Sequence, residues 1–163
     1  MALIVSGGTT ELSVQPDSYN PFRGILVGGA LAEALDSDDQ YLRFNPGFTI
    51  NSTEAPVWLE FQGTIAATPS ALDIVVESQS GTPGLAFTIE AFNWPSQSYD
   101  TIQAFDETFN MDSIVTVDIS SGIADYVTPS SGQVLSRIGW RQTGFTINFP
   151  WEIRLDQFGW SVQ

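Results

Sequence analysis

Carboxylates and aromatic rings are the side chains of this sequence that could do chemistry, because the other reactive types are missing. The 163 residues include nineteen Asp and Glu and five Arg, but no Lys, His or Cys. A Ser nucleophile would therefore lack its usual base, and thiolate nucleophiles and Cys-based metal sites are excluded. Hydrolysis of glycosides needs only two carboxylates and stays open.

Three glutamates occupy polar positions of strands that we predict in the middle of the chain: Glu60, Glu77 and Glu90. A glycosidase would need two of them at a suitable separation. Solvent-facing Glu is common on β-sheets, however, and no catalytic motif accompanies these three residues. We therefore predict a protein that is not an enzyme, with no catalytic residues and no cofactor.

A short acidic cluster, Asp36, Asp38 and Asp39, offers oxygen ligands of the kind that Ca²⁺ prefers. The cluster lacks the glycine and the distal Glu of an EF-hand loop. Short Asp clusters are also frequent where helices and strands meet, as caps and turns. A solvated turn is the favoured interpretation, and the three residues remain weak calcium candidates.

Aromatic residues interrupt polar positions in the middle of the chain, at Trp58, Phe92, Trp94 and Tyr99. Exposed rings can stack on sugars or form a protein interface, and they can also lie under a second core layer. The sequence leaves these three interpretations open. With the apolar residues near the N-terminus they make up the interface candidates: Leu3, Ile4, Val5, Trp58, Trp94 and Tyr99.

The elements that must position these residues are short strands with period-two alternation. The clearest lie at 57–62, 72–77 and 85–90, separated by turns rich in Pro and Gly. The apolar run 22–27 reads as a strand buried on both faces, and residues 31–35 as a short helix. Near the C-terminus one apolar face continues through 145–155 and then changes side, which predicts a β-bulge near 156–157.

This spacing of strands predicts an all-β fold, an antiparallel β-sandwich of jelly-roll type with eight to nine strands and one short connecting helix. We expect an N-terminal arm at 1–20 and a single sandwich domain at 21–163. The arm is apolar at Leu3, Ile4 and Val5, and it either packs on its own domain or reaches a neighbouring subunit.

Two classes of partner are not expected, the first of them because of the formal charge of −14. Such a charge repels the phosphate backbone, so nucleic acid is not an expected partner. A membrane is not expected either, because no apolar segment approaches about 18 residues.

Two passages carry a resemblance to a known type of module. The first is RGILVGG at 23–29 with SDDQYL at 37–42, and the second is PWEIRLDQ at 150–157, ending at Trp160. With the strand at 71–77 they resemble a jelly-roll or galactose-binding-like β-sandwich module found in secreted bacterial multi-domain proteins and in tailed-phage proteins. The resemblance implies a structural or adhesive function.

Two functional hypotheses follow from the resemblance, the arm and the missing catalytic groups. The first is a non-enzymatic virion structural protein, a phage capsid decoration (cement) protein that contacts capsid or other virion proteins as a homo-oligomer. An export signal and a second module are not recognisable in the sequence, which favours this hypothesis. The alternative is a carbohydrate- or cell-surface-binding module that works outside the cell with a glycan as its partner.

Overall fold

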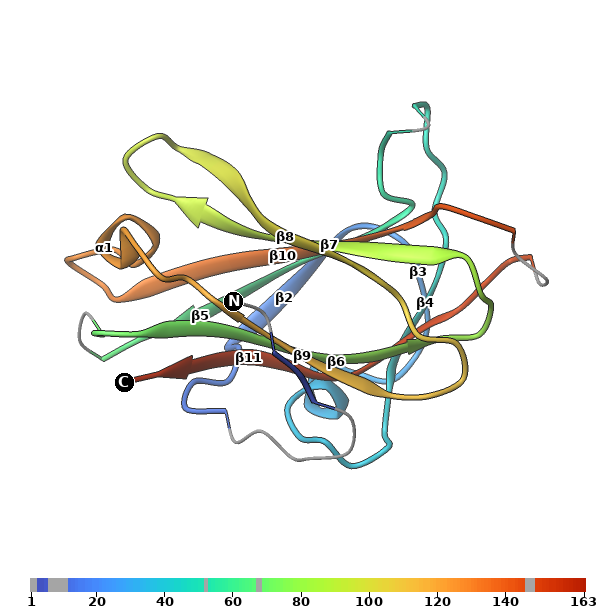
Figure 1. Ribbon diagram of the computed structural model, residues 1–163, viewed down its shortest axis with the longest axis horizontal. Helices are drawn as coiled ribbons and strands as arrows, with labels where there is room; N and C mark the ends of the chain where they lie inside the picture. Colours follow the sequence, from blue (N-terminus) through green and yellow to red (C-terminus); the bar gives the residue numbers. More distant parts are fainter. Residues whose placement is uncertain (1–2, 6–11, 52, 67–68, 146–148) are drawn as a thin grey trace.

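The computed structural model describes residues 3–5, 12–51, 53–66, 69–145 and 149–163, and of 3–5 the backbone alone. Its strands form two antiparallel sheets packed face to face (Figure 1). The six-stranded sheet has the order β1 (Leu3–Val5), β9 (Ser113–Asp118), β6 (Leu72–Ser80), β11 (Ile153–Val162), β4 (Leu42–Asn45), β3 (Ile25–Gly28). The five-stranded sheet has the order β2 (Ser18–Arg23), β5 (Val57–Thr64), β10 (Gln133–Gln142), β7 (Leu85–Asn93), β8 (Ser98–Asp106).

Two one-turn helical segments complete the described elements, a 3-10 turn η1 (Leu31–Ala34) and a helix α1 (Ile123–Tyr126). The predicted all-β jelly-roll sandwich is thus confirmed, with eleven described strands where the sequence predicted eight to nine. Neither helical segment approaches the length or apolar character that crossing a membrane requires.

The core lies between the two sheets and follows the predicted alternation. On β5 the residues Val57, Leu59 and Phe61 are buried, while the residues between them are partly exposed. Phe61 stacks on Phe158 of the opposite sheet with ring centroids 4.0 Å apart. Burial of these large side chains provides the main stabilisation of the sandwich.

The apolar run 22–27 is not one buried strand, contrary to the sequence prediction. Gly24 has a φ of +110°, a conformation that favours glycine, and it divides the run between the two sheets. The residues of β3 then lie on the edge strand of the six-stranded sheet, so Ile25, Leu26 and Val27 remain exposed. An apolar run does not by itself distinguish an inner strand from an edge strand.

The prediction that one apolar face of a single strand continues through 145–155 is also wrong, because β11 begins at Ile153. Phe145 and Phe149 lie in the connection between β10 and β11 and are almost fully exposed. The bulge was predicted correctly: the register between β11 and β6 shifts between Leu155 and Gln157.

The N-terminal residues Leu3–Val5 form an edge strand of this chain's own six-stranded sheet. Their backbone pairs antiparallel with β9, with Leu3 opposite Thr116. Further along, β2 spans 18–23 and so crosses the predicted boundary between arm and domain. A contact of Leu3, Ile4 and Val5 with a neighbouring subunit remains a prediction.

Candidate functional site

The outer face of the five-stranded sheet collects polar and aromatic side chains in rows that cross the strands. Strand pairing places Glu60 of β5 opposite Arg137 of β10, Arg137 opposite Glu90 of β7, and Glu90 opposite Thr101 of β8. The period-two pleat turns these side chains away from the core. One continuous row therefore runs across four strands.

A neighbouring row runs parallel to the first. Trp58 lies opposite Gly139, Gly139 opposite Thr88, and Thr88 opposite Ala104. A Cβ atom at Gly139 would lie 2.8 Å from the Ala55 Cβ and 3.4 Å from Trp58 Cδ1. Because position 139 has no side chain, there is room for the Trp58 ring, and this part of the face is hollowed.

Arg137 joins the aromatic residues of this face. Its Cζ lies 4.3 Å from the centroid of the Trp58 ring and 3.7 Å from that of Tyr99. Its Nε donates to Glu90 Oε2 at 2.6 Å. A guanidinium between two ring faces and paired with a carboxylate is held by cation–π attraction and by a charge-assisted hydrogen bond. We call Trp58, Arg137 and Tyr99 the aromatic–arginine platform.

The hydroxyl of Tyr99 donates to Glu60. Burial, followed by this contact with the Glu60 carboxylate, raises the pKa of Tyr99 above its ordinary value. The phenol therefore stays protonated over the physiological range and keeps its donor role. This bond fixes the Tyr99 ring against Arg137.

Further aromatic rings extend the platform at both ends. Phe92 lies edge-on to Tyr99 with centroids 5.0 Å apart, and Trp94 lies edge-on to Phe92 at 4.9 Å. At the other end Phe22 lies 6.0 Å from the Trp58 ring. The predicted candidates Trp58, Tyr99 and Trp94 thus belong to one band, whereas Leu3–Val5 lie in the other sheet.

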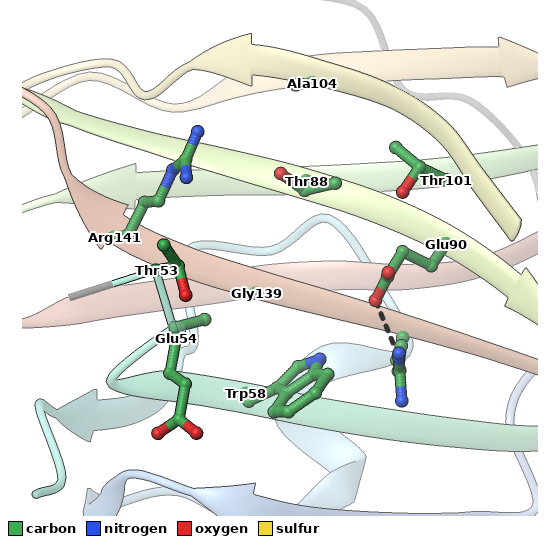
Figure 2. A pocket seen from close by; sticks show the side chains of 11 residues that line it. Thr53, Glu54, Trp58, Thr88, Glu90, Thr101, Ala104, Gly139 and Arg141 are labelled. Atoms are coloured by element: carbon green, nitrogen blue, oxygen red, sulfur yellow. Dashed lines mark hydrogen bonds and ion pairs between the residues drawn. The ribbon is translucent and has the colours of Figure 1, made fainter. Parts of the chain in front are cut away.

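A hollow of about 530 Å³ opens on this face beside Trp58 (Figure 2). We call it the Trp58 hollow. It is lined by Thr53, Glu54, Ala55, Trp58, Thr88, Glu90, Thr101, Ala104, Arg137, Gly139 and Arg141. Hydroxyls, two carboxylates and two guanidinium groups therefore surround one large ring, a mixture that suits a ligand with both apolar faces and hydroxyl groups.

The three glutamates considered for glycoside hydrolysis do not share one face. Glu60 and Glu90 lie on the outer face of the five-stranded sheet, where they bind Tyr99 and Arg137. Glu77 belongs to β6 of the other sheet and is 8% exposed, so the prediction that it faces solvent is wrong. Its position next to the bulge of β11 buries it.

The Asp36, Asp38 and Asp39 cluster lies between η1 and β4 and serves local hydrogen bonds. Asp38 accepts from the backbone N–H of Gln40 at 3.1 Å and from its side-chain amide at 2.8 Å. Asp39 accepts from the hydroxyl of Tyr41 at 3.3 Å. Among the described residues, no three acidic side chains lie close enough together to hold a metal ion.

Sequence reasoning missed the central role of Arg137 and Gly139. In a strand with period-two alternation, the spacing Arg-x-Gly-x-Arg puts Arg137, Gly139 and Arg141 on one face. That spacing was the available signal. The identity of the partners depends on strand order, which the sequence pattern does not contain.

Several carbohydrate-binding modules with solved structures are similar to this chain in fold. The module CBM28, specific for non-crystalline cellulose, is similar with a TM-score of 0.58 and 9% identity, over 96% of each chain. Chitosan-binding module 1, derived from a chitosanase/glucanase of Paenibacillus sp. IK-5, gives a TM-score of 0.50 and 10% identity, over 93% of this chain and 98% of that one. A family 29 carbohydrate-binding module gives a TM-score of 0.50 and 7% identity, over 97% of this chain and 89% of that one.

No family model matches the sequence, and no curated protein matches it either. The structural similarities establish the fold, which confirms the predicted jelly-roll sandwich. They show the fold alone and give no support to the capsid-decoration hypothesis.

Proposed function

We propose that this protein is a non-enzymatic carbohydrate-binding module that holds a glycan chain on the outer face of its five-stranded sheet. The observation that carries the proposal is the aromatic–arginine platform of Trp58, Arg137 and Tyr99 beside an open hollow of about 530 Å³. Sugar rings pack their C–H faces on aromatic rings, and their hydroxyls need polar partners nearby.

The polar partners are already in place around the ring. Thr88 and Thr101 provide hydroxyls on the two strands beyond β10, and Thr53 provides one on the loop before β5 (Figure 2). The Arg137–Glu90 pair is held before any ligand arrives. A preorganised surface of this kind loses little conformational entropy on binding.

The fold neighbours support the same proposal, because each of the three described above is a carbohydrate-binding module. Polysaccharides of the kind bound by such modules lie outside cells. The proposal therefore implies an extracellular or cell-surface location.

A glycan array followed by calorimetric titration of the hits tests the proposal. Trp58→Ala removes the ring that a sugar would cover, so we expect at least about a tenfold loss of affinity, which corresponds to about 1.4 kcal/mol. Phe109→Ala is the matched control, since this ring is 42% exposed and lies beside Ser80 of the other sheet. A blank array, or a loss of binding with Phe109→Ala but not with Trp58→Ala, would contradict the proposal.

One observation favours the capsid-decoration role as a second candidate. Phe48, Ile50, Phe145 and Phe149 are between 80% and 91% exposed, on two loops that border a common hollow. Apolar side chains exposed to this extent are typical of protein contact surfaces. A stable oligomer in sedimentation velocity, together with a blank glycan array, would favour this candidate, and a monomer that binds glycans would contradict it.

A further inference from the structure

Arg141 stands apart from the other four arginines of this acidic chain. Each of those lies within 4.0 Å of a carboxylate: Arg23 of Glu54, Arg43 of Glu152, Arg137 of Glu90 and Arg154 of Glu152. No described carboxylate forms such a pair with Arg141, although the sequence has nineteen acidic residues for five basic ones. Its guanidinium is exposed and retains its hydrogen-bond donors.

Arg141 lies where two hollows of the outer face meet. It lines the Trp58 hollow, and it also lines a second hollow of about 450 Å³. The second hollow is formed by Thr49, Glu54, Pro56, Arg141, Gln142, Thr143 and Gly144. A chain that extends from Trp58 toward the loop at 46–56 would therefore pass the guanidinium of Arg141.

The two carboxylates of the Trp58 hollow do not neutralise Arg141. Glu90 is paired with Arg137 at 2.6 Å, and Glu54 is paired with Arg23 at 3.0 Å. In Figure 2 the side chain of Arg141 points away from that of Glu54. The charge left without a counterion in this hollow is thus positive, in a protein whose net charge is −14.

We propose that the glycan bound by this face carries carboxylates, that is, that it contains uronic acid residues, with Arg141 binding a uronate. This inference rests on the proposed carbohydrate-binding function. A guanidinium presents its N–H groups in a planar fork that matches a carboxylate with two parallel hydrogen bonds. Trp58 supports the sugar ring, and Arg141 selects the charged substituent.

The test compares acidic polysaccharides with their own carboxyl-reduced forms, which differ only in the charged group. Polygalacturonate, alginate and hyaluronan are each titrated in both forms at physiological salt. We expect at least one acidic form to bind about tenfold or more tightly than its reduced form, because a charge-assisted hydrogen bond is stronger than one between neutral groups. Arg141→Gln should abolish this difference, because it should weaken binding of the acidic form about tenfold more than binding of the reduced form.

Arg43→Gln is the matched control, because it changes the net charge equally but lies on β4 of the other sheet. It should keep the preference for the acidic form. If the acidic and reduced forms bind with equal affinity, and Trp58→Ala abolishes binding of both, the inference is overturned and the proposed function stands. An equal loss for both forms in Arg141→Gln would overturn it too. Failure to bind any polysaccharide would overturn the proposed function itself.

Discussion

Asp156 makes the stability of this protein depend on pH in an unusual direction. The residue lies at the bulge of β11, is 1% exposed, and its Oδ1 has no described hydrogen-bond partner. Burial, together with the neighbouring carboxylates of Glu77 and Asp112, raises its pKa from 3.8 to about 7, while a hydrogen bond from the Asp39 backbone N–H opposes this rise. The folded protein therefore prefers Asp156 protonated.

The magnitude follows from linkage between protonation and folding. Below about pH 4 Asp156 is protonated in both the folded and the unfolded chain, so it imposes no penalty. Between about pH 4 and 7 the unfolded chain releases the proton and the folded protein keeps it, which lowers the free energy of unfolding by up to about 1.4 kcal/mol per pH unit. Above about pH 7 the accumulated penalty is about 4 kcal/mol and no longer grows.

The assay is urea unfolding of the wild type and of Asp156→Asn at several values between pH 4 and 8, in EDTA. The neutral amide should remove the part of the decline that Asp156 causes, so the variant should be about 2 to 4 kcal/mol more stable than the wild type at pH 8 and within about 1 kcal/mol of it at pH 4. A residual slope should remain, because burial also raises the pKa of Glu77 and that of Glu107. Asp106→Asn removes the same charge from an exposed position on β8 and should keep the wild-type decline. Equal pH slopes for the wild type and Asp156→Asn would refute the reasoning.

Two further predictions concern stability. Gly132→Ala should lower the free energy of unfolding by more than about 2 kcal/mol in chemical denaturation, because Gly132 has a φ of +67° and a Cβ would lie 1.9 Å from the Ile65 carbonyl oxygen. Gly122 has the same φ but more room, so Gly122→Ala should cost about 1 kcal/mol, and equal costs for the two variants would contradict this prediction. Phe158→Ala should lower the free energy of unfolding by about 3 to 5 kcal/mol, because it opens a cavity in the core, whereas Phe149→Ala at an exposed position should change it by less than about 0.5 kcal/mol. A small effect of Phe158→Ala would contradict the prediction and show that the core relaxes around the missing ring.

Local patterns predicted much of the architecture. The alternation of β5 identified Val57, Leu59 and Phe61 as core residues, and the change of apolar side after Leu155 identified the bulge. These features depend on the two-residue period of a strand, which can be read from adjacent positions. The same reading failed at 22–27, where the positive φ of Gly24 and the edge position of β3 decide the outcome.

The candidate site was visible in the sequence only as separate parts. Trp58 and Tyr99 stood out as aromatic residues at polar positions, whereas Arg137 was not recognised as a site residue. The order β5-β10-β7-β8 places Arg137 between the two rings and next to Glu90. Strand order is fixed by how the whole sandwich closes over its core, through contacts between distant parts of the chain. The residue types of the site were therefore determined by the sequence, and their meeting on one face was decided by the tertiary structure.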